Sequence, residues 1–461
     1  MKYNYTTYMF LAALVGIEAW FFSKIFPIPF LGYLFDILSF PVLTQLVVAE
    51  IDEPSWRFVA LFLKDVLLFS FYGLLVAVII KSASISLKVI SSLILLAMMF
   101  SGSLITGLEA AWEADCDNKT RYQTPVTRSY ITREVTIEGG APDVRLSGEL
   151  TLPVGEGPFP GIVLISGSEP TDRNSFILGH SPFLVLADYL TRQGYAVLRH
   201  DDRGYGKSTG NTYEALDDDF SKDAAAALKW LRSQKKIDAN RVGFVGHSQG
   251  AAKAPMAAQI ERPDFMIFIA GGLEGVGRLL LRQGRDIAQA GGVPADKLKR
   301  MERDLTKVIE IVASSKTPVE SKKKLEKFAM SEGVGVVLAK QLSAEYSTPW
   351  IVSELTASHN PFEKTDRKIS ALIKAYEGPI LALYGEKDLL VSARLEMPVI
   401  KTLLTNSQSR AIVLPGLNHF MQPVPQTKEP RQAVIEACDI ETTIAPNALK
   451  TIGDWLKVIL K

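Results

Sequence analysis

The feature that most constrains the fold is a regular alternation of short apolar runs with amphipathic helical segments. The runs PFPGIVLISG, YAVLRHD, RVGFVGHS and DFMIFIAGG are typical of buried strands, and helical patterns at 181–194, 218–234 and 250–261 separate them. Strands that alternate with helices indicate a parallel sheet covered by helices on both faces. Two alternating segments at 130–139 and 144–153 precede this region and predict a hairpin that leads into the sheet.

The alternation is interrupted after Gly271 by about 100 charged, mainly helical residues. It resumes with the strand patterns GPILALYGEKD and SRAIVLPGLNH, and IAPNALKTIGDWLKVIL predicts a closing helix. Open α/β sheets bind ligands at the carboxyl ends of their strands. We therefore interpret residues 273–376 as a helical lid inserted over that edge.

The N-terminal region has a different composition. Only 13 of residues 1–110 are charged, against 88 of the other 351. Apolar stretches at 8–26, 27–48, 58–80 and 89–108 approach the length of about 20 residues that a membrane helix needs. The second contains three prolines and Asp36, so we expect three or four helices in an all-α transmembrane module over 1–112, with the lipid bilayer as its partner. A cleaved signal peptide is the alternative for the first stretch, although Glu18 interrupts it and no A-x-A-like site follows.

The orientation of this module rests on two lysines. Lys81 and Lys88 flank the connection before the last apolar stretch, and positively charged loops stay in the cytoplasm. This predicts an integral protein of the plasma membrane with the domain after Trp112 on the extracytoplasmic side. Cys116 and Cys438 would then form a disulfide or remain two free thiols, and the sequence leaves both open. The few intramembrane charges, such as Lys64 and Asp65, are interpreted as helix pairing or interfacial groups rather than a conduction path.

One short motif carries the chemistry of the domain. Gly246-His247-Ser248-Gln249-Gly250 is a G-x-S-x-G sequence between a predicted strand and a predicted helix, which is the context that this motif requires for a serine nucleophile. A plain tight turn is the structural alternative. A serine hydroxyl needs a base to accept its proton.

The base and its acid partner follow from chain order. In the order nucleophile, acid, histidine, the base follows Ser248, and His419 lies just after the last predicted strand. His180 and His200 come too early, His247 adjoins the nucleophile, and His359 lies in the inserted block. Asp388 follows the strand ILALYG and fits the acid, with Glu386 as the second choice.

Two backbone donors are expected to stabilise the oxyanion of an acyl-transfer reaction. We assign them to the N–H groups of Gln249, which follows the nucleophile, and Ser168, in the loop after the GIVLIS strand. Neither a Gly-rich phosphate loop nor zinc-ligand spacing occurs, so no cofactor and no metal are predicted. A net charge of +1 gives no basic surface for nucleic acid.

Several other residues allow two interpretations. The charged turn HDDRGYGKSTG, which begins at His200, could contact substrate, but a hydrogen-bonded structural loop is favoured. Asp172 and Arg173 could form a pair near the oxyanion loop, and Glu169 could reach the mouth of a pocket. Trp350 and Phe362 could line an acyl pocket, although apolar residues at helical spacing more often form a core.

These blocks resemble a known family. The segments LTLPVGEGPFPGIVLISGS, PTDRN, VLRHDDRGYGKSTG, VGHSQG, LALYGEKDLLV, LPGLNHFMQ and ETTIAPNALKTIGDWL are similar to those of α/β-hydrolases, and more narrowly of bacterial esterases of the esterase D type, related to dienelactone hydrolases and the prolyl-oligopeptidase-like branch. The resemblance runs from about Tyr130 to Lys461. It implies an α/β-hydrolase domain over 123–461 that cleaves carboxylic esters through an acyl-enzyme on Ser248, with His419 and Asp388 completing the triad.

The sequence departs from that pattern at three places: SGSE, GHSQGA and DLLV stand where SGSG, GHSEGG and DLQV are usual. Taken with the apolar N-terminal region, the resemblance predicts a membrane-anchored serine hydrolase that acts on small esters or other acyl substrates. A peptidase or thioesterase of the same fold, and a catalytically silent membrane scaffold, remain as alternatives. The sequence specifies neither the acyl group nor the oligomeric state.

Overall fold

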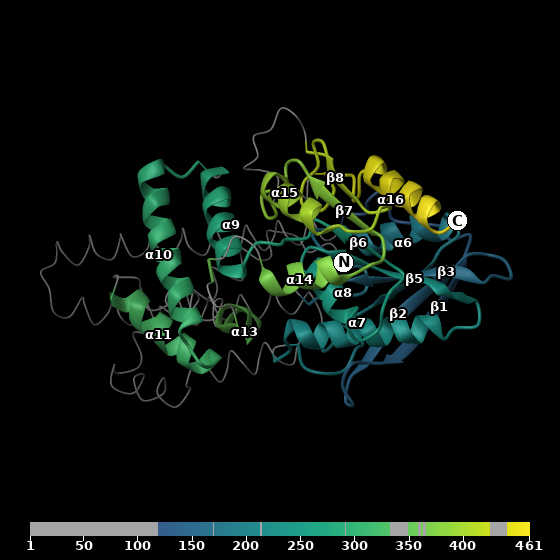
Figure 1. Cartoon of the computed structure of the whole chain (residues 1–461), viewed down its shortest axis with the longest axis horizontal. Helices are drawn as coiled ribbons and strands as arrows, with labels where there is room; N and C mark the ends of the chain where they lie inside the picture. Colours follow the sequence, from purple (N-terminus) through teal and green to yellow (C-terminus); the bar gives the residue numbers. More distant parts are fainter. Residues whose placement is uncertain are drawn as a thin grey trace, which may run out of the picture. The chain divides into compact units, whose positions relative to one another are not determined.

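The computed structural model describes residues 119–461 apart from Glu169, Tyr213, Gly291 and the segments 332–348, 358–360, 363–365 and 425–439. Eight strands form one sheet in the order β1-β2-β4-β3-β5-β6-β7-β8 (Figure 1). They are β1 (Ile131–Glu138), β2 (Arg145–Leu152), β3 (Phe159–Ile165), β4 (Ala196–His200), β5 (Ile237–His247), β6 (Phe265–Ile269), β7 (Ile380–Gly385) and β8 (Arg410–Leu414).

The sheet is mostly parallel, as predicted. Strand β2 is antiparallel to both β1 and β4, and every pair from β4 to β8 is parallel. All residues of β6 and β7 are buried, because parallel strands are covered on both faces. The register pairs Ile165 with Gly246 and His247 with Ile269, so β3, β5 and β6 end at the same edge.

Helices cover both faces of the sheet (Figure 1). One apolar core packs α7 (Asp217–Arg232), α8 (Gly250–Ala257), α14 (Arg367–Ala375) and α15 (Ala393–Leu403) against one face. A second core packs α6 (Pro182–Arg192) and α16 (Pro446–Ile459) against the other. This three-layer arrangement, with its strand order, is the α/β-hydrolase fold expected from the sequence.

The chain between β6 and β7 is helical. It contains α9 (Val276–Ala290), α10 (Ala295–Ala313), α11 (Pro318–Ser331), α13 (Pro349–Ala357) and α14. The first four share a small core of their own, built around Ile309 and Leu355, beside the sheet (Figure 1). Phe362 packs on that core, in agreement with the structural interpretation of this residue. The role of residues 273–376 as a lid stays a prediction.

The predicted membrane module, residues 1–112, lies outside the described residues, as do Cys116 and Cys438. Within the part of the chain that is described, no helix is both long and apolar enough to cross a bilayer. The described chain begins at Lys119, and the buried Arg121 donates a hydrogen bond to the carbonyl of Leu178 at 3.1 Å.

A buried acid holds the start of the inserted helices. The carboxylate of Glu396 accepts the N–H of Leu273 at 2.9 Å, and the carbonyl of Leu273 accepts the N–H of Asp366, from the far end of the insert. Burial raises the pKa of Glu396 to about 7, the Leu273 N–H opposes this shift, and the charge of Glu274 adds to it. The pKa of this carboxyl group is therefore higher in the folded chain than in the unfolded chain, where 4.5 is the ordinary value.

This shift predicts a stability that depends on pH. Proton binding by the folded chain stabilises it fully below pH 4.5, and that contribution is lost as the pH rises through 7. Glu396→Gln keeps a neutral side chain at every pH, so the variant should gain up to about 3 kcal/mol over wild type above pH 8 and little near pH 4.5. Urea unfolding at the two pH values measures the difference. The same change at exposed Glu214 is the control, and equal gains at both pH values would contradict the prediction.

Candidate active site

Ser248 lies on the turn between β5 and α8. Its backbone φ is +54°, a conformation that non-glycine residues rarely adopt and that marks strained functional turns. The Ser248 N–H donates to the carbonyl of Ile269 at 2.8 Å, which fixes the turn against the end of β6. The serine is therefore held at the carboxyl edge of the sheet by a backbone that costs free energy to form.

The two glycines of the motif are required by close backbone contacts. A methyl group on Gly246 would lie 2.3 Å from the carbonyl oxygen of Gly250, and one on Gly250 would lie 2.3 Å from the carbonyl oxygen of Ile165. Neither oxygen belongs to a flexible side chain, so larger residues would force the turn apart. These distances account for the two glycines of the G-x-S-x-G spacing.

His419 and Asp388 form a buried hydrogen-bonded pair. The Nδ1 atom of His419 lies 2.8 Å from Oδ2 of Asp388, and the side chains are 6% and 0% exposed. The other oxygen of Asp388 accepts the N–H groups of Leu390 and Val391, both at 2.8 Å. Because a carboxylate accepts and does not donate, Nδ1 carries the proton and Nε2 is free to act as a base.

Main-chain contacts bring the two loops together. The N–H of Lys387 donates to the carbonyl of Leu417 at 2.8 Å, and a methyl group on Gly385 would meet that same carbonyl at 2.4 Å. The carboxylate of Glu386 instead accepts the N–H of Gly416, in an exposed turn. The structure thus brings Asp388, and not Glu386, to the imidazole of His419.

His247, the residue directly before Ser248, contacts His419. The ring of His247 lies 4.9 Å from that of His419, centroid to centroid, and its Nε2–H donates to the His419 carbonyl at 3.1 Å. Burial lowers the pKa of His247 to about 4, and His419 adds to the shift. His247 is therefore neutral at pH 7 and places no second positive charge beside an imidazolium at His419.

The loop after β3 borders the nucleophile. A methyl group on Gly167 would lie 3.4 Å from Cβ of Ser248. Among the described residues, the N–H groups of Ser168 and Gln249 donate no hydrogen bond to the protein, which leaves both free for an oxyanion. The Gln249 side chain donates to Asp217 at 2.5 Å, so this residue contributes to the site through its backbone. Glu169 lies outside the described residues.

The charged side chains of the turn after β4 form ion pairs with other side chains of the domain. Arg173 donates to both oxygens of Asp201 at 3.0 Å, and Arg203 donates to Asp223 at 2.7 Å. These contacts support the structural interpretation of the turn. A pair between Asp172 and Arg173 does not form, because Asp172 instead accepts the N–H groups of Asn174 and Phe176 and closes its own turn.

The inserted helices contribute to the acid loop. Arg282 of α9 is 6% exposed and donates to the carbonyls of Leu389 at 3.4 Å and Leu390 at 2.9 Å. Its Nε donates to Glu274 at 2.6 Å. The turn that carries Asp388 is therefore held partly from within residues 273–376.

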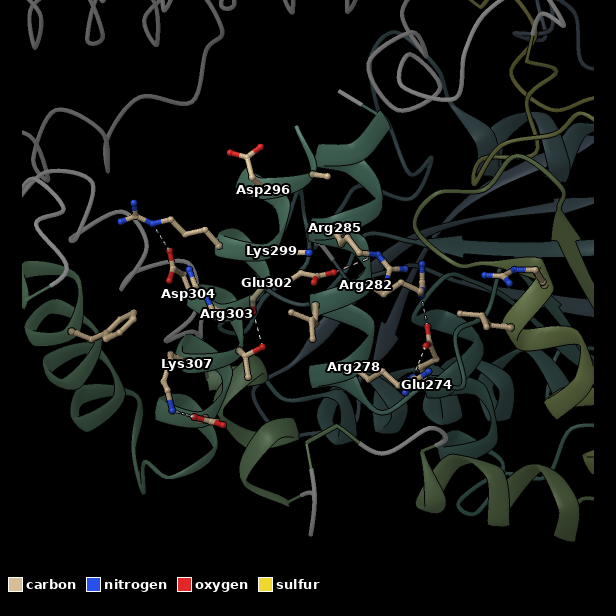
Figure 2. Close-up of a pocket in the computed structure, with 18 residues that line it drawn as sticks. Glu274, Arg278, Arg282, Arg285, Asp296, Lys299, Glu302, Arg303, Asp304 and Lys307 are labelled. Carbon is tan, nitrogen blue, oxygen red and sulfur yellow. Dashed lines mark hydrogen bonds and ion pairs between the residues drawn. The ribbon is translucent and has the colours of Figure 1, made fainter. Parts of the chain in front are cut away.

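Beside Arg282 the structure contains a cavity of 1490 Å³ between α9, α10 and α15 (Figure 2). Its lining is mostly charged, with more basic than acidic residues: Arg278, Arg282, Arg285, Lys299, Arg300, Arg303, Lys307 and Arg394 against Glu274, Asp296, Glu302, Asp304 and Glu310. Phe362 does not line this cavity, so the cavity is not the apolar acyl pocket suggested for that residue.

Sequence reasoning missed Lys253. This lysine of α8 is 2% exposed, and its Nζ lies 2.5 Å from the carbonyl oxygen of Gly167. The signal was a single cation in the otherwise apolar helix GAAKAPMAA, five residues after the nucleophile. A fully buried lysine is rare unless it is paired, so this position required an explanation.

The fold, and the serine, histidine and aspartate that follow three of its strands, define the class of the protein: a serine hydrolase of the α/β-hydrolase fold. Comparison with known families is more specific. A family described as X-Pro dipeptidyl-peptidase (S15 family) matches residues 139–395, which is more than half of the chain. The chain belongs to this family.

Individual relatives include enzymes named as esterases. Esterase EstD of Thermotoga maritima is 25% identical over 306 residues, covering 66% of this chain and 64% of its own length. Esterase FrsA of Klebsiella pneumoniae is 30% identical over 160 residues, 34% of this chain and 36% of its own length. This chain thus spans less than two thirds of either relative. A solved esterase of Pyrococcus furiosus is 16% identical, with a TM-score of 0.43 over 72% of this chain and 93% of that one.

Proposed function

We propose that this chain hydrolyses carboxylic esters of small molecules through an acyl-enzyme on Ser248. The observation that carries the proposal is the buried pair of His419 and Asp388 at 2.8 Å. The ring of His419 lies 4.9 Å from that of His247, the residue directly before Ser248, whose φ is +54°. The names of the relatives EstD and FrsA support an ester as the substrate.

The geometry supports a two-step reaction. His419 accepts the proton of Ser248 through Nε2 while the serine oxygen attacks the ester carbonyl, and the resulting oxyanion accepts the N–H groups of Gln249 and Ser168. Collapse of this intermediate breaks the bond to the alcohol, which leaves with the proton from His419. Water then attacks the acyl-enzyme by the same route, and the carboxylic acid is released as Ser248 regains its proton.

Peptide hydrolysis is the second candidate, because the family that the chain belongs to is described as a dipeptidyl-peptidase. The same residues would serve, with an amine as the leaving group protonated by His419. The fold and the triad do not distinguish an ester from an amide, since fold does not imply substrate.

A comparison of matched substrates tests the proposal. The purified full-length chain would be assayed with p-nitrophenyl butyrate and with an X-Pro p-nitroanilide, which release related chromophores. We expect the larger kcat/KM for the ester. A larger kcat/KM for the anilide would instead favour the peptidase, and no turnover of either would favour a silent scaffold.

We also propose that residues 1–112 anchor the chain in the plasma membrane with the hydrolase domain on the outer side. Support comes from the scarcity of charge over residues 1–110 and from Lys81 and Lys88 before the last apolar stretch. The chain is expected in the membrane fraction after alkaline carbonate washing. Protease added to intact spheroplasts should then digest the domain, and protection of the domain would reverse the proposed orientation.

A further inference from the structure

Lys253 contacts the loop after β3, which contains Ser168, the proposed second oxyanion donor. Its ammonium group lies 2.5 Å from the carbonyl oxygen of Gly167 and 3.4 Å from that of Ser166. It also lies 4.6 Å from the centre of the Phe220 ring, a cation–π distance. The cation is thus enclosed by two carbonyls and an aromatic face, immediately under the loop that follows β3.

The contact fixes one peptide group. The carbonyl of Gly167 and the N–H of Ser168 belong to the same planar peptide, and in the trans form they point in opposite directions. A cation that holds the carbonyl on the α8 side therefore turns the Ser168 N–H to the other side. Hydrogen bonding to a carbonyl also polarises its amide, which makes the N–H a stronger donor.

The rest of the loop is held by Asp202. Its carboxylate accepts the hydroxyl of Ser166 at 2.7 Å and the N–H of Thr171 at 3.0 Å, so it fixes the loop on both sides of the Gly167–Ser168 peptide. Burial raises the pKa of Asp202, and the charge of Lys253 opposes that shift. Asp202 thus anchors the two ends of the loop, whereas Lys253 contacts the peptide between them.

We propose that Lys253 is a positioning residue for catalysis, which orients and polarises the Gly167–Ser168 peptide so that its N–H serves as the second oxyanion donor. This inference rests on the proposed function of Ser248. It assigns a role to a side chain that touches neither the substrate nor the triad. Together with the charge of the buried Asp202, this contact accounts for the presence of a lysine in the apolar core of α8.

The test compares Lys253→Met with Lys253→Arg in the full-length chain. Methionine keeps an unbranched side chain one atom shorter than that of lysine and removes the charge and hydrogen bonds, whereas arginine keeps a cationic donor. Loss of one oxyanion donor costs about 10² to 10³ in kcat, so a misdirected donor should cost roughly 10 to 100-fold. We expect this loss in the methionine variant with KM nearly unchanged, and a smaller loss in the arginine variant.

Three measurements separate positioning from folding. Active sites are first titrated with a fluorophosphonate, and kcat is expressed per titrated site. A trifluoromethyl ketone, which forms a tetrahedral adduct with an oxyanion, should bind the methionine variant more weakly by the same factor as the loss of kcat/KM. The melting temperature reports the fold, and Lys229→Met at an exposed position of α7 is the matched control.

An unchanged kcat per titrated site in Lys253→Met would overturn the inference, and so would ketone binding equal to wild type. Both results would leave the proposed function intact, because wild type would still be labelled and active. If the fluorophosphonate fails to label wild type, the proposed function fails and the role of Lys253 fails with it.

Discussion

Replacement of Ser248 by alanine is expected to lower kcat by about six orders of magnitude, because the serine oxygen forms the covalent bond to the acyl group. The hydrogen bond between His419 and Asp388 does not involve the Ser248 side chain, so it should persist in the variant. Alanine should also relieve little of the backbone strain, since it too has a Cβ at a φ of +54°.

Two readouts check this expectation: hydrolysis of p-nitrophenyl butyrate and labelling by a fluorophosphonate probe. Both should disappear in Ser248→Ala and persist in Ser407→Ala, which changes an exposed serine in the turn before β8. Continued labelling of the Ser248 variant at the wild-type rate would show that another residue is the nucleophile.

Asp388→Asn is expected to reduce kcat by about 10⁴-fold while the fold is kept. The asparagine oxygen can still accept the N–H groups of Leu390 and Val391, which orients its NH₂ group toward His419. An amide donor at this position favours the imidazole tautomer whose proton is on Nε2, and that nitrogen can then no longer accept the serine proton.

The matched control is Glu386→Gln, which alters the neighbouring acid by the same chemical change. Among the described residues its carboxylate accepts the N–H of Gly416 in an exposed turn and does not contact His419, so kcat should stay near the wild-type value. The kcat of both variants is measured from pH 6 to 9. A large loss in the glutamine variant together with an active asparagine variant would exchange the roles of the two acids.

Much of this fold could be predicted because its signals are local. The sheet and its interruption after β6 could be predicted from apolar runs of strand length, from the glycines that end them and from the amphipathic helices between them. The triad residues could be predicted for a related reason, since Ser248, Asp388 and His419 lie one, three and five residues after the ends of β5, β7 and β8. Parallel strands end at one edge, so residues at their ends are brought close together whatever lies between them.

The remaining features depend on contacts between distant residues. Arg173 has an acid directly before it in the sequence, yet it pairs with Asp201 because β4 ends beside the loop after β3. Lys253 gave a visible signal, but its partner is a carbonyl oxygen, which every residue possesses and no sequence pattern identifies. The charged lining of the cavity beside α9 was likewise not predictable, because it depends on how α9, α10 and α15 pack together.

The contact from Arg282 to the carbonyls of Leu389 and Leu390 limits how this enzyme can diversify. If the predicted lid is exchanged for that of a relative, the chimera also loses the hydrogen bonds from Arg282 that hold the turn carrying Asp388. A transplanted segment would have to supply an equivalent guanidinium, or the recipient would lose turnover along with its old preference. We therefore expect replacement of α9 to lower the rate of hydrolysis, whatever the new segment does to substrate preference.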